Sequence, residues 1–168
     1  PAQPTAAEPG MPRRDIRARE VCLAQVDPDP DSLQLRHRRY RAVGGRAHFI
    51  SIEDPVHDLL IGFCRLRFPS FAPDQPGAPG TESDPIRPEL EDAALVRELH
   101  VYGNEVGIGG DGDWQHQGYG TKLLERAEEL SREAGYEKIA VISGIGAREY
   151  YRNKLGYRQD GPYVSKRL

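Results

Sequence analysis

Gln115-His116-Gln117-Gly118-Tyr119-Gly120, a Q-x-x-G-x-G turn, is the stretch of this chain that decides the fold. It follows an apolar run, Leu95–Tyr102, that predicts a strand, and it opens an amphipathic segment that predicts a helix up to Gly135. Glycines in a turn before a helix leave backbone N–H groups directed outward without intrahelical partners. With the positive end of the helix dipole, these groups favour a bound pyrophosphate. Many helices start this way with no ligand, so the surrounding elements decide the interpretation.

Length and composition indicate one globular domain. The chain has 168 residues, 38% of them hydrophobic, and a formal net charge of −3, so composition alone does not predict general nucleic-acid binding. Cys22 and Cys64 lie far apart without metal-ligand spacing, so we expect no metal site in this chain. No apolar run approaches the ~18 residues of a membrane span, and the N-terminus lacks an apolar signal core. These features predict a cytoplasmic protein.

The chain divides into three parts by composition. Residues 1–11, rich in Pro and Ala, predict a disordered end or an expression remnant. Residues 12–32 form a basic and then acidic segment that leads into the main domain, residues 33–168. Within that domain, the proline- and glycine-rich residues 69–88 predict a surface loop.

Arginines gather in two places, residues 13–19 and residues 36–46. They predict an RNA-facing patch, with two alternatives: a solvated strand face, or partners within the chain for the acidic residues 27–31.

Apolar periodicity orders the elements of the main domain. We expect a hairpin from Phe49–Ile52 and Leu59–Phe68, the strand Leu95–Tyr102, the helix to Gly135, a central parallel strand Lys138–Ser143, a helix Ala147–Leu155 that stops at Gly156, and an extended end with a turn at Gly161-Pro162. The first helix has an apolar stripe at Tyr119, Leu123, Leu124, Ala127, Leu130 and Ala134, with the Glu128–Arg132 pair expected outside it. The order predicts an α/β fold with a mixed sheet.

Five motifs in this order carry a resemblance to a known family. They are Val96-Arg97-Glu98-Leu99-His100-Val101-Tyr102-Gly103, Gln115-His116-Gln117-Gly118-Tyr119-Gly120-Thr121, Lys138-Ile139-Ala140-Val141-Ile142-Ser143-Gly144, Tyr150-Tyr151-Arg152 and Asp160-Gly161-Pro162-Tyr163. The chain resembles the GCN5-related N-acetyltransferases, and more closely the C-terminal acetyltransferase domain of the Elongator catalytic subunit, the tRNA uridine(34) acetyltransferase family. The resemblance implies a mixed, mostly antiparallel sheet flanked by helices.

The resemblance also implies a function. In that family an acetyl-CoA-binding domain of this type is joined to a radical S-adenosylmethionine domain, and the enzyme begins the carboxymethyl group at carbon 5 of the wobble uridine of certain tRNAs. The expected partners are therefore tRNA, the radical domain, and a homodimer or an Elongator-like assembly, with no membrane. This sequence has no C-x-x-x-C-x-x-C motif, so the iron–sulfur cluster and S-adenosylmethionine would belong to a domain not present in it. Two alternatives stay open: a protein (histone-type) lysine acetyltransferase, and a non-catalytic acetyl-CoA- and RNA-binding module.

The cofactor site is expected along one strand and the following turn. The backbone of the strand would pair with the pantetheine arm, with an N–H near Val101 polarising the thioester carbonyl, and the turn would hold the pyrophosphate. Trp114 would pack on the cofactor or simply on its own loop. The residues expected at acetyl-CoA are Glu98, Leu99, His100, Val101, Trp114, Gln115, His116, Gln117, Gly118, Tyr119, Gly120, Thr121 and Tyr151.

The catalytic candidates are Tyr150, Tyr151 and Glu98. One tyrosine would face the sulfur of coenzyme A and donate to the departing thiolate, while the alternative is a packed aromatic pair. Glu98 and His100 alternate onto one face of their strand, where either would serve as a base if burial tuned its pKa. The alternative for Glu98 is an exposed ion pair with an arginine such as Arg97. Relative to similar sequences, one extra residue before Leu155-Gly156-Tyr157 predicts a bulge or an early end of the helix.

Overall fold

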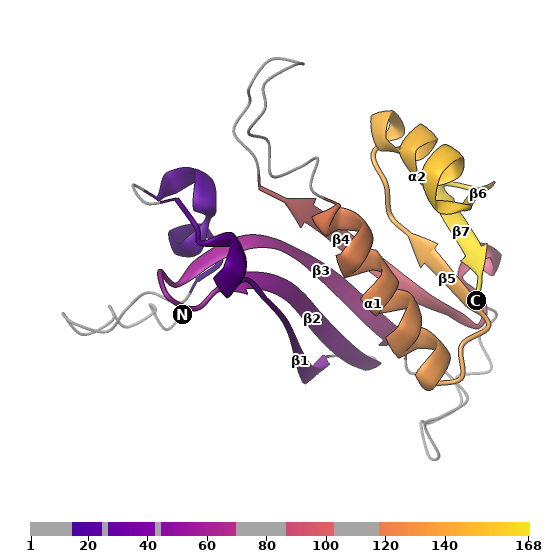
Figure 1. The fold of residues 1–168 in the computed structure, drawn as a ribbon. Coiled ribbons are helices and arrows are strands. Elements are labelled where there is room, and N and C mark those ends of the chain that lie inside the picture. Colours follow the sequence, from indigo (N-terminus) through magenta and orange to yellow (C-terminus); the bar gives the residue numbers. More distant parts are fainter. Residues whose placement is uncertain (1–14, 25–26, 43–44, 70–86, 103–117) are drawn as a thin grey trace, which may run out of the picture.

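The computed structural model describes residues 15–24, 27–42, 45–69, 87–102 and 118–168, and these form one sheet with two α-helices (Figure 1). The sheet has seven strands in the order β1-β2-β3-β4-β5-β7-β6. The strands are β1 Gln34–Ala42, β2 Gly45–Asp54, β3 Leu59–Pro69, β4 Ala93–Val101, β5 Lys138–Val141, β6 Arg158–Asp160 and β7 Tyr163–Arg167, and the helices are α1 Tyr119–Glu133 and α2 Arg148–Leu155. Short 3-10 helices include η1 Arg17–Arg19 and η2 Val21–Leu23.

The strands pair as the sequence predicts for a mixed, mostly antiparallel sheet. β1 to β4 form an antiparallel meander, β5 is parallel to β4, and β7 is antiparallel to both β5 and β6. The predicted β2–β3 hairpin is confirmed, and the extended C-terminal end is a β6–β7 hairpin that turns at Gly161, whose φ is 58°. The predicted strand Lys138–Ser143 is too long, because neither neighbouring strand pairs with it beyond Val141 apart from one bond to Ile142.

Helix α1 packs its apolar stripe on the sheet, where the core lies. Leu123, Leu124 and Ala127 are fully or almost fully buried against strands that include β2, β3 and β4. The predicted Glu128–Arg132 pair is confirmed at 3.3 Å, but Glu128 is buried, with only 5% of the residue exposed, which its position outside the apolar stripe does not predict. The Tyr157 hydroxyl donates to one carboxylate oxygen at 2.9 Å and the Lys166 ammonium lies 3.0 Å away, so two C-terminal side chains compensate the buried charge.

The other face of the sheet is partly covered by the N-terminal residues. On β2 the side chains alternate, so that Ile50 faces α1 while Phe49, Ser51 and Glu53 face away from it. Val21 of η2 is buried in the core cluster, and Glu20 forms an isolated bridge with Leu60 of β3. The segment over 12–32 is therefore packed on the domain at residues 15–24, while its predicted boundaries stay a prediction.

No helix in the described part of the chain is long and apolar enough to cross a membrane. Among the same residues, no group of three or more His, Cys, Asp or Glu side chains is arranged to hold a metal ion.

Candidate functional site

Strands β4 and β5 pair for only part of their length. Their ladder runs from Ala93 opposite Lys138 to Val96 opposite Val141, and its last bond joins the Ile142 N–H to the Val96 carbonyl at 2.9 Å. Within the described part of the chain, β4 then continues to Val101 paired with β3 alone, and Figure 1 shows β4 and β5 diverging beyond this point. Arg97 has no opposite residue on β3, because Arg65 pairs with Glu98 and Leu66 pairs with Val96. A bulge of this kind bends a strand, which suits the separation.

The opened edge of β4 presents backbone groups at two of the four predicted positions, Leu99 and Val101, whereas the backbone groups of Glu98 and His100 point toward β3. The Tyr102 N–H donates to the Ile61 carbonyl of β3 at 2.9 Å. Since successive residues of an antiparallel strand direct their N–H and C=O groups to opposite sides, those of Leu99 and Val101 point away from β3, into the opening. An extended ligand can pair with this edge as another strand would.

Helix α1 begins beside this edge. Gly118 has a φ of 75°, in the left-handed region, and its carbonyl accepts the first helical bond from Lys122 at 3.0 Å. The next three N–H groups, of Tyr119, Gly120 and Thr121, precede the first possible intrahelical donor. A Cβ at Gly120 would lie 3.7 Å from the Val101 side chain, so the helix start and the end of β4 are in contact. Of the predicted cofactor residues, 114–117 lie outside the described residues.

The two tyrosines of α2 occupy different environments. The Tyr150 hydroxyl lies 3.2 Å from the Thr121 hydroxyl, so α2 reaches the first turn of α1, and Tyr150 is 41% exposed. Tyr151 is buried and meets the Tyr157 ring edge-on with centroids 5.7 Å apart. Burial, with smaller effects of Cys64 and Tyr150, raises the pKa of Tyr151 to about 12. Tyr151 is therefore protonated at neutral pH and acts as a hydrogen-bond donor.

The end of α2 absorbs the extra residue that the sequence pattern indicates. The N–H groups of Gly156 and Tyr157 both donate to the Tyr151 carbonyl, five and six residues back, instead of following the usual four-residue spacing. Gly156 has a φ of 75°, as a left-handed helix terminus requires. The wide final turn leaves the residues Arg148–Leu155 helical, so both tyrosines keep their helical orientation.

Glu98 and His100 lie on the same face of β4, as predicted, but this is the face turned away from α1. Glu98 pairs with Arg65 of β3 at 3.4 Å, and both side chains are 46% exposed. The alternative for Glu98, an exposed ion pair with an arginine, is confirmed, but its partner is Arg65, directly opposite on β3, rather than Arg97, which sits in the bulge. The burial that a tuned Glu98 base would need is absent.

A cavity of about 480 Å³ opens beside Glu98 and His100, and the sequence analysis missed it. Phe63, Arg65, Glu98, His100 and Tyr102 line it from the sheet, and Ile16, Arg17 and Glu20 line it from the N-terminal segment. Burial and the hydrogen-bonded Glu20 raise the pKa of Tyr102 to about 12. The sequence does contain one sign of this cavity, because Phe63 and Arg65 alternate onto the same face of β3. The antiparallel register of β3 and β4 then brings these two side chains next to His100 and Glu98.

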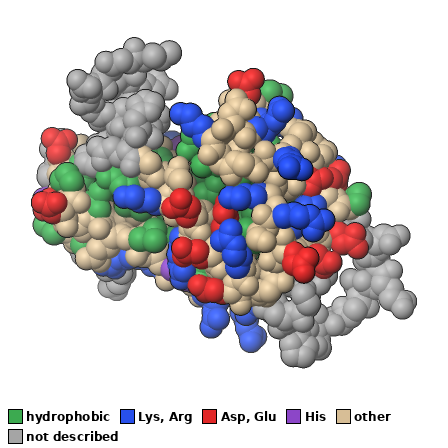
Figure 2. All heavy atoms as spheres, turned by 45° about the vertical axis from the view of Figure 1, so that its right-hand side comes forward, with side chains coloured by type: hydrophobic (Ala, Val, Ile, Leu, Met, Phe, Trp, Pro, Cys, Tyr) green, Lys and Arg blue, Asp and Glu red, His purple; other side chains and the backbone are tan. Residues whose placement is uncertain are grey.

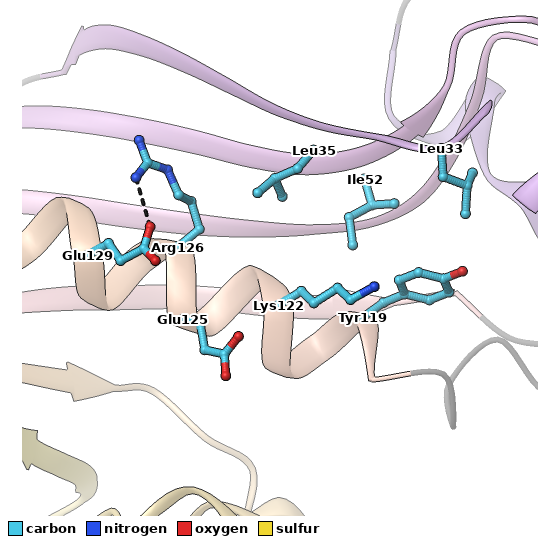
Figure 3. A pocket seen from close by; sticks show the side chains of 8 residues that line it. All are labelled: Leu33, Leu35, Ile52, Tyr119, Lys122, Glu125, Arg126 and Glu129. Atoms are coloured by element: carbon cyan, nitrogen blue, oxygen red, sulfur yellow. Dashed lines mark hydrogen bonds and ion pairs between the residues drawn. The ribbon is translucent and has the colours of Figure 1, made fainter. Parts of the chain in front are cut away.

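A second groove, about 310 Å³, lies on the flank of α1 that faces β1 (Figure 3). Leu33, Leu35 and Ile52 form its apolar side, and the Lys122 ammonium lies 5.3 Å above the Tyr119 ring. On the face of the molecule drawn in Figure 2, acidic and basic side chains are interspersed. The described residues on that face therefore form no patch of a single charge sign.

The arginines of β1 are split between two roles. Arg38 pairs with Glu53 of β2 rather than with the acidic residues 27–31, while Arg36, Arg39 and Arg41 are exposed. Pairing within the chain is thus confirmed for Arg38 and also for Arg19, which pairs with Glu53 and Asp58, but not with residues 27–31, and the RNA-facing patch stays a prediction.

Comparison with known proteins adds a family to this geometry. The model of the acetyltransferase (GNAT) family matches residues 19–157. The chain belongs to the GNAT acetyltransferase family. The diverging β4 and β5 and the glycine start of α1 are therefore features of a GNAT domain, and the predicted fold class is confirmed.

Two relatives and one solved structure are similar over nearly the whole GNAT chain. It is 48% identical over 165 residues to Elongator complex protein 3 of Dictyostelium discoideum, covering 95% of this chain and 27% of that protein. It is 42% identical over 168 residues to the tRNA uridine(34) acetyltransferase of Methanocaldococcus infernus, covering 95% and 29%. The structure of the archaeal Methanocaldococcus infernus Elp3 with an N-terminal deletion matches with a TM-score of 0.74 and 41% identity, covering 91% of this chain and 35% of that one. The chain thus spans little more than a quarter of the curated relatives' length.

Proposed function

We propose that this GNAT chain binds acetyl-CoA and supplies its acetyl group for modification of the wobble uridine of tRNA, as the names of its relatives indicate. Since those relatives are much longer, the remaining chemistry would belong to a radical S-adenosylmethionine domain carrying an iron–sulfur cluster, outside this sequence. An assembly of the Elongator kind or a homodimer, and a cytoplasmic location, belong to the same proposal.

The opened edge of β4 beside the start of α1 carries the proposal. The pantetheine arm would pair with Leu99 and Val101, whose backbone groups point into the opening. The pyrophosphate would lie at the N–H groups of Tyr119, Gly120 and Thr121 and of the preceding turn. The proximity of Gly120 to Val101 supports this arrangement, because one continuous cofactor would need the two subsites side by side.

Two groups would act on the thioester, and a third would position the helix beside it. The Val101 N–H would donate to the thioester carbonyl oxygen and stabilise the charge that develops there. The Tyr151 hydroxyl, with a pKa of about 12, would hydrogen-bond the departing thiolate rather than transfer its proton fully. Tyr150, bonded to Thr121, would hold the first turn of α1 in place beside the cofactor.

Acetyl-CoA hydrolysis, measured with and without tRNA, tests this proposal. We expect binding of acetyl-CoA by calorimetry, and hydrolysis that rises when tRNA is added. Tyr151→Phe is expected to lower turnover more than acetyl-CoA affinity, and Tyr150→Phe is expected to affect both. Hydrolysis unchanged by tRNA would contradict the RNA-linked function, and acetylation of a lysine peptide would favour the protein acetyltransferase. Unchanged tRNA modification by Tyr150→Phe and Tyr151→Phe variants of the full-length enzyme would favour the binding module.

A further inference from the structure

Three aromatic rings form a stack across the face of the sheet that is turned away from α1. Phe49 of β2 and Phe63 of β3 have centroids 5.4 Å apart and planes inclined by 20°. Phe63 and His100 of β4 follow at 6.0 Å and 24°. The stack therefore runs from strand to strand toward the open edge of β4, and it ends on His100, which is exposed.

The last ring of the stack lies in the 480 Å³ cavity described above. This volume falls within the ~300–1,000 Å³ of small-molecule sites. Tyr102 meets His100 at a steep angle with centroids 4.5 Å apart and bounds the cavity with a second ring. The Arg65 guanidinium lies 5.6 Å above Phe63, and the buried Phe63 thus supports both Arg65 and His100.

The polar groups of this cavity are of both signs. Glu98 and Arg65 line it from the sheet and Arg17 lines it from η1, with Glu98 and Arg17 both exposed. A carboxylate accepts from the ring N–H or amino group of a base, and an arginine donates to a base carbonyl or a phosphate. Beyond Phe49, Arg36 and Arg38 of β1 line the neighbouring cavity on this face. The face thus offers ring surfaces flanked by cations.

We propose that this cavity binds a nucleobase of a single-stranded RNA segment, stacked on His100 as the next member of the Phe49–Phe63–His100 stack, with Glu98 and Arg65 at its edge. This proposal rests on the proposed function and deepens it. It names a site for the RNA base on the face of β4 that is turned away from α1. Single-stranded RNA is read by stacking unpaired bases on aromatic side chains and hydrogen-bonding their edges. The cavity is lined by two arginines and two glutamates, so its charge does not select for an incoming ammonium, whereas the parallel rings of Phe63 and His100 suit a planar base.

The test compares two fluorescent oligonucleotides by anisotropy: a chain of five ribose phosphates that carries one uracil base, at its centre (the complete oligonucleotide), and the same chain with that base removed. Both carry the same phosphates, so charge alone does not distinguish them. The wild-type chain is expected to prefer the complete oligonucleotide by about tenfold, within what one base–aromatic stack contributes. His100→Ala is expected to abolish the preference, and His100→Phe to keep it. Tyr40→Ala is the matched control, because Tyr40 is an exposed aromatic of β1 outside the cavity.

Equal binding of the two oligonucleotides by the wild-type chain overturns the proposal without any variant. A preference that survives in His100→Ala, or that disappears in Tyr40→Ala, overturns it as well. Calorimetry with acetyl-CoA is run separately on the wild-type chain. A chain that binds acetyl-CoA but does not distinguish the oligonucleotides refutes the base site alone, whereas the opposite result refutes the proposed cofactor function alone.

Discussion

Glu53→Gln tests the cluster of ion pairs and hydrogen bonds around Glu53 that holds the N-terminal segment on the sheet. The Glu53 side chain is 3% exposed, and its carboxylate accepts hydrogen bonds from Arg19 of η1, Arg38 of β1 and Ser51. Burial by itself would raise the pKa of Glu53, but the hydrogen bonds from Arg38, Ser51 and Arg19 outweigh it and lower the pKa to about 2. The carboxylate is therefore charged at every pH at which the protein is handled.

The size of the effect follows from the two pKa values. The ordinary value is 4.5, so the folded state lowers the pKa by about 2.5, which corresponds to about 3 kcal/mol at ~1.4 kcal/mol for each pKa unit. A lowered carboxyl pKa stabilises the fold fully above pH 4.5, and this contribution is lost as the pH falls toward 2. Glu53→Gln is expected to lower the free energy of unfolding by about 3 kcal/mol at pH 7 and by much less near pH 3.

Urea denaturation at pH 7 and near pH 3 measures this difference. Glu129→Gln is the matched control, because Glu129 pairs with Arg126 at 2.9 Å but is 56% exposed, and an exposed pair contributes at most about 1 kcal/mol. The reasoning is refuted if Glu53→Gln costs no more than the control at pH 7, or if its cost does not shrink in acid. Because Arg19 follows the cavity-lining Arg17, Glu53→Gln is also expected to weaken oligonucleotide binding.

Three further changes test other parts of the fold. Burial, followed by His37, Arg46 and Arg39, lowers the pKa of His48 to about 4, so wild-type stability is expected to fall between pH 6.5 and 4. His48→Phe, which keeps a ring against Phe68, should reduce this fall in urea titrations without removing it, because the pKa of His37 is lowered as well. Glu128→Ala leaves Lys166 without its buried carboxylate and should cost about 3–5 kcal/mol by the same method. Gly118→Ala should lower the free energy of unfolding by about 1 kcal/mol, measured by thermal unfolding, because the φ of 75° at Gly118 disfavours a side chain although the space around it is open. Gly118→Asn should lower it by less, and equal losses for the two variants would contradict this reasoning.

The order of the elements could be predicted from the sequence because it depends on local signals. Period-2 alternation in β2 and β3, the 3.6-residue stripe of α1 and the glycine at 156 each act within one segment. The burial of Glu128 could not be predicted because its compensating partners, Tyr157 and Lys166, come from 29 and 38 residues further along the chain. No local pattern reports such a pairing.

In the candidate site, too, the features set by local alternation could be predicted, and those set by the pairing of distant strands could not. Glu98 and His100 could be placed on one face of β4 by alternation, but their neighbours Arg65 and Phe63 follow from the β3–β4 register, which the bulge at Arg97 shifts by one residue. The separation of β4 from β5 is likewise a property of two strands that are distant in sequence. Periodicity does not identify a ligand for that opening. The expectation that acetyl-CoA binds there came from the resemblance to a family.

The backbone groups and the side chains of β4 point in different directions, and we expect them to serve different ligands. Backbone groups of Leu99 and Val101 point in the plane of the sheet into the opening, while the side chains of Glu98 and His100 stand out of that plane on the face turned away from α1. A thioester paired with the strand edge would then meet an acceptor held by the side chains of the same few residues. This predicts that substitutions of the Glu98 and His100 side chains act mainly on RNA, whereas Gly62→Ala, whose Cβ would lie 2.8 Å from the His100 carbonyl, displaces the β4 backbone and acts on acetyl-CoA. Calorimetry and anisotropy on both sets of variants measure the split, and acetyl-CoA affinity unchanged in Gly62→Ala would contradict it.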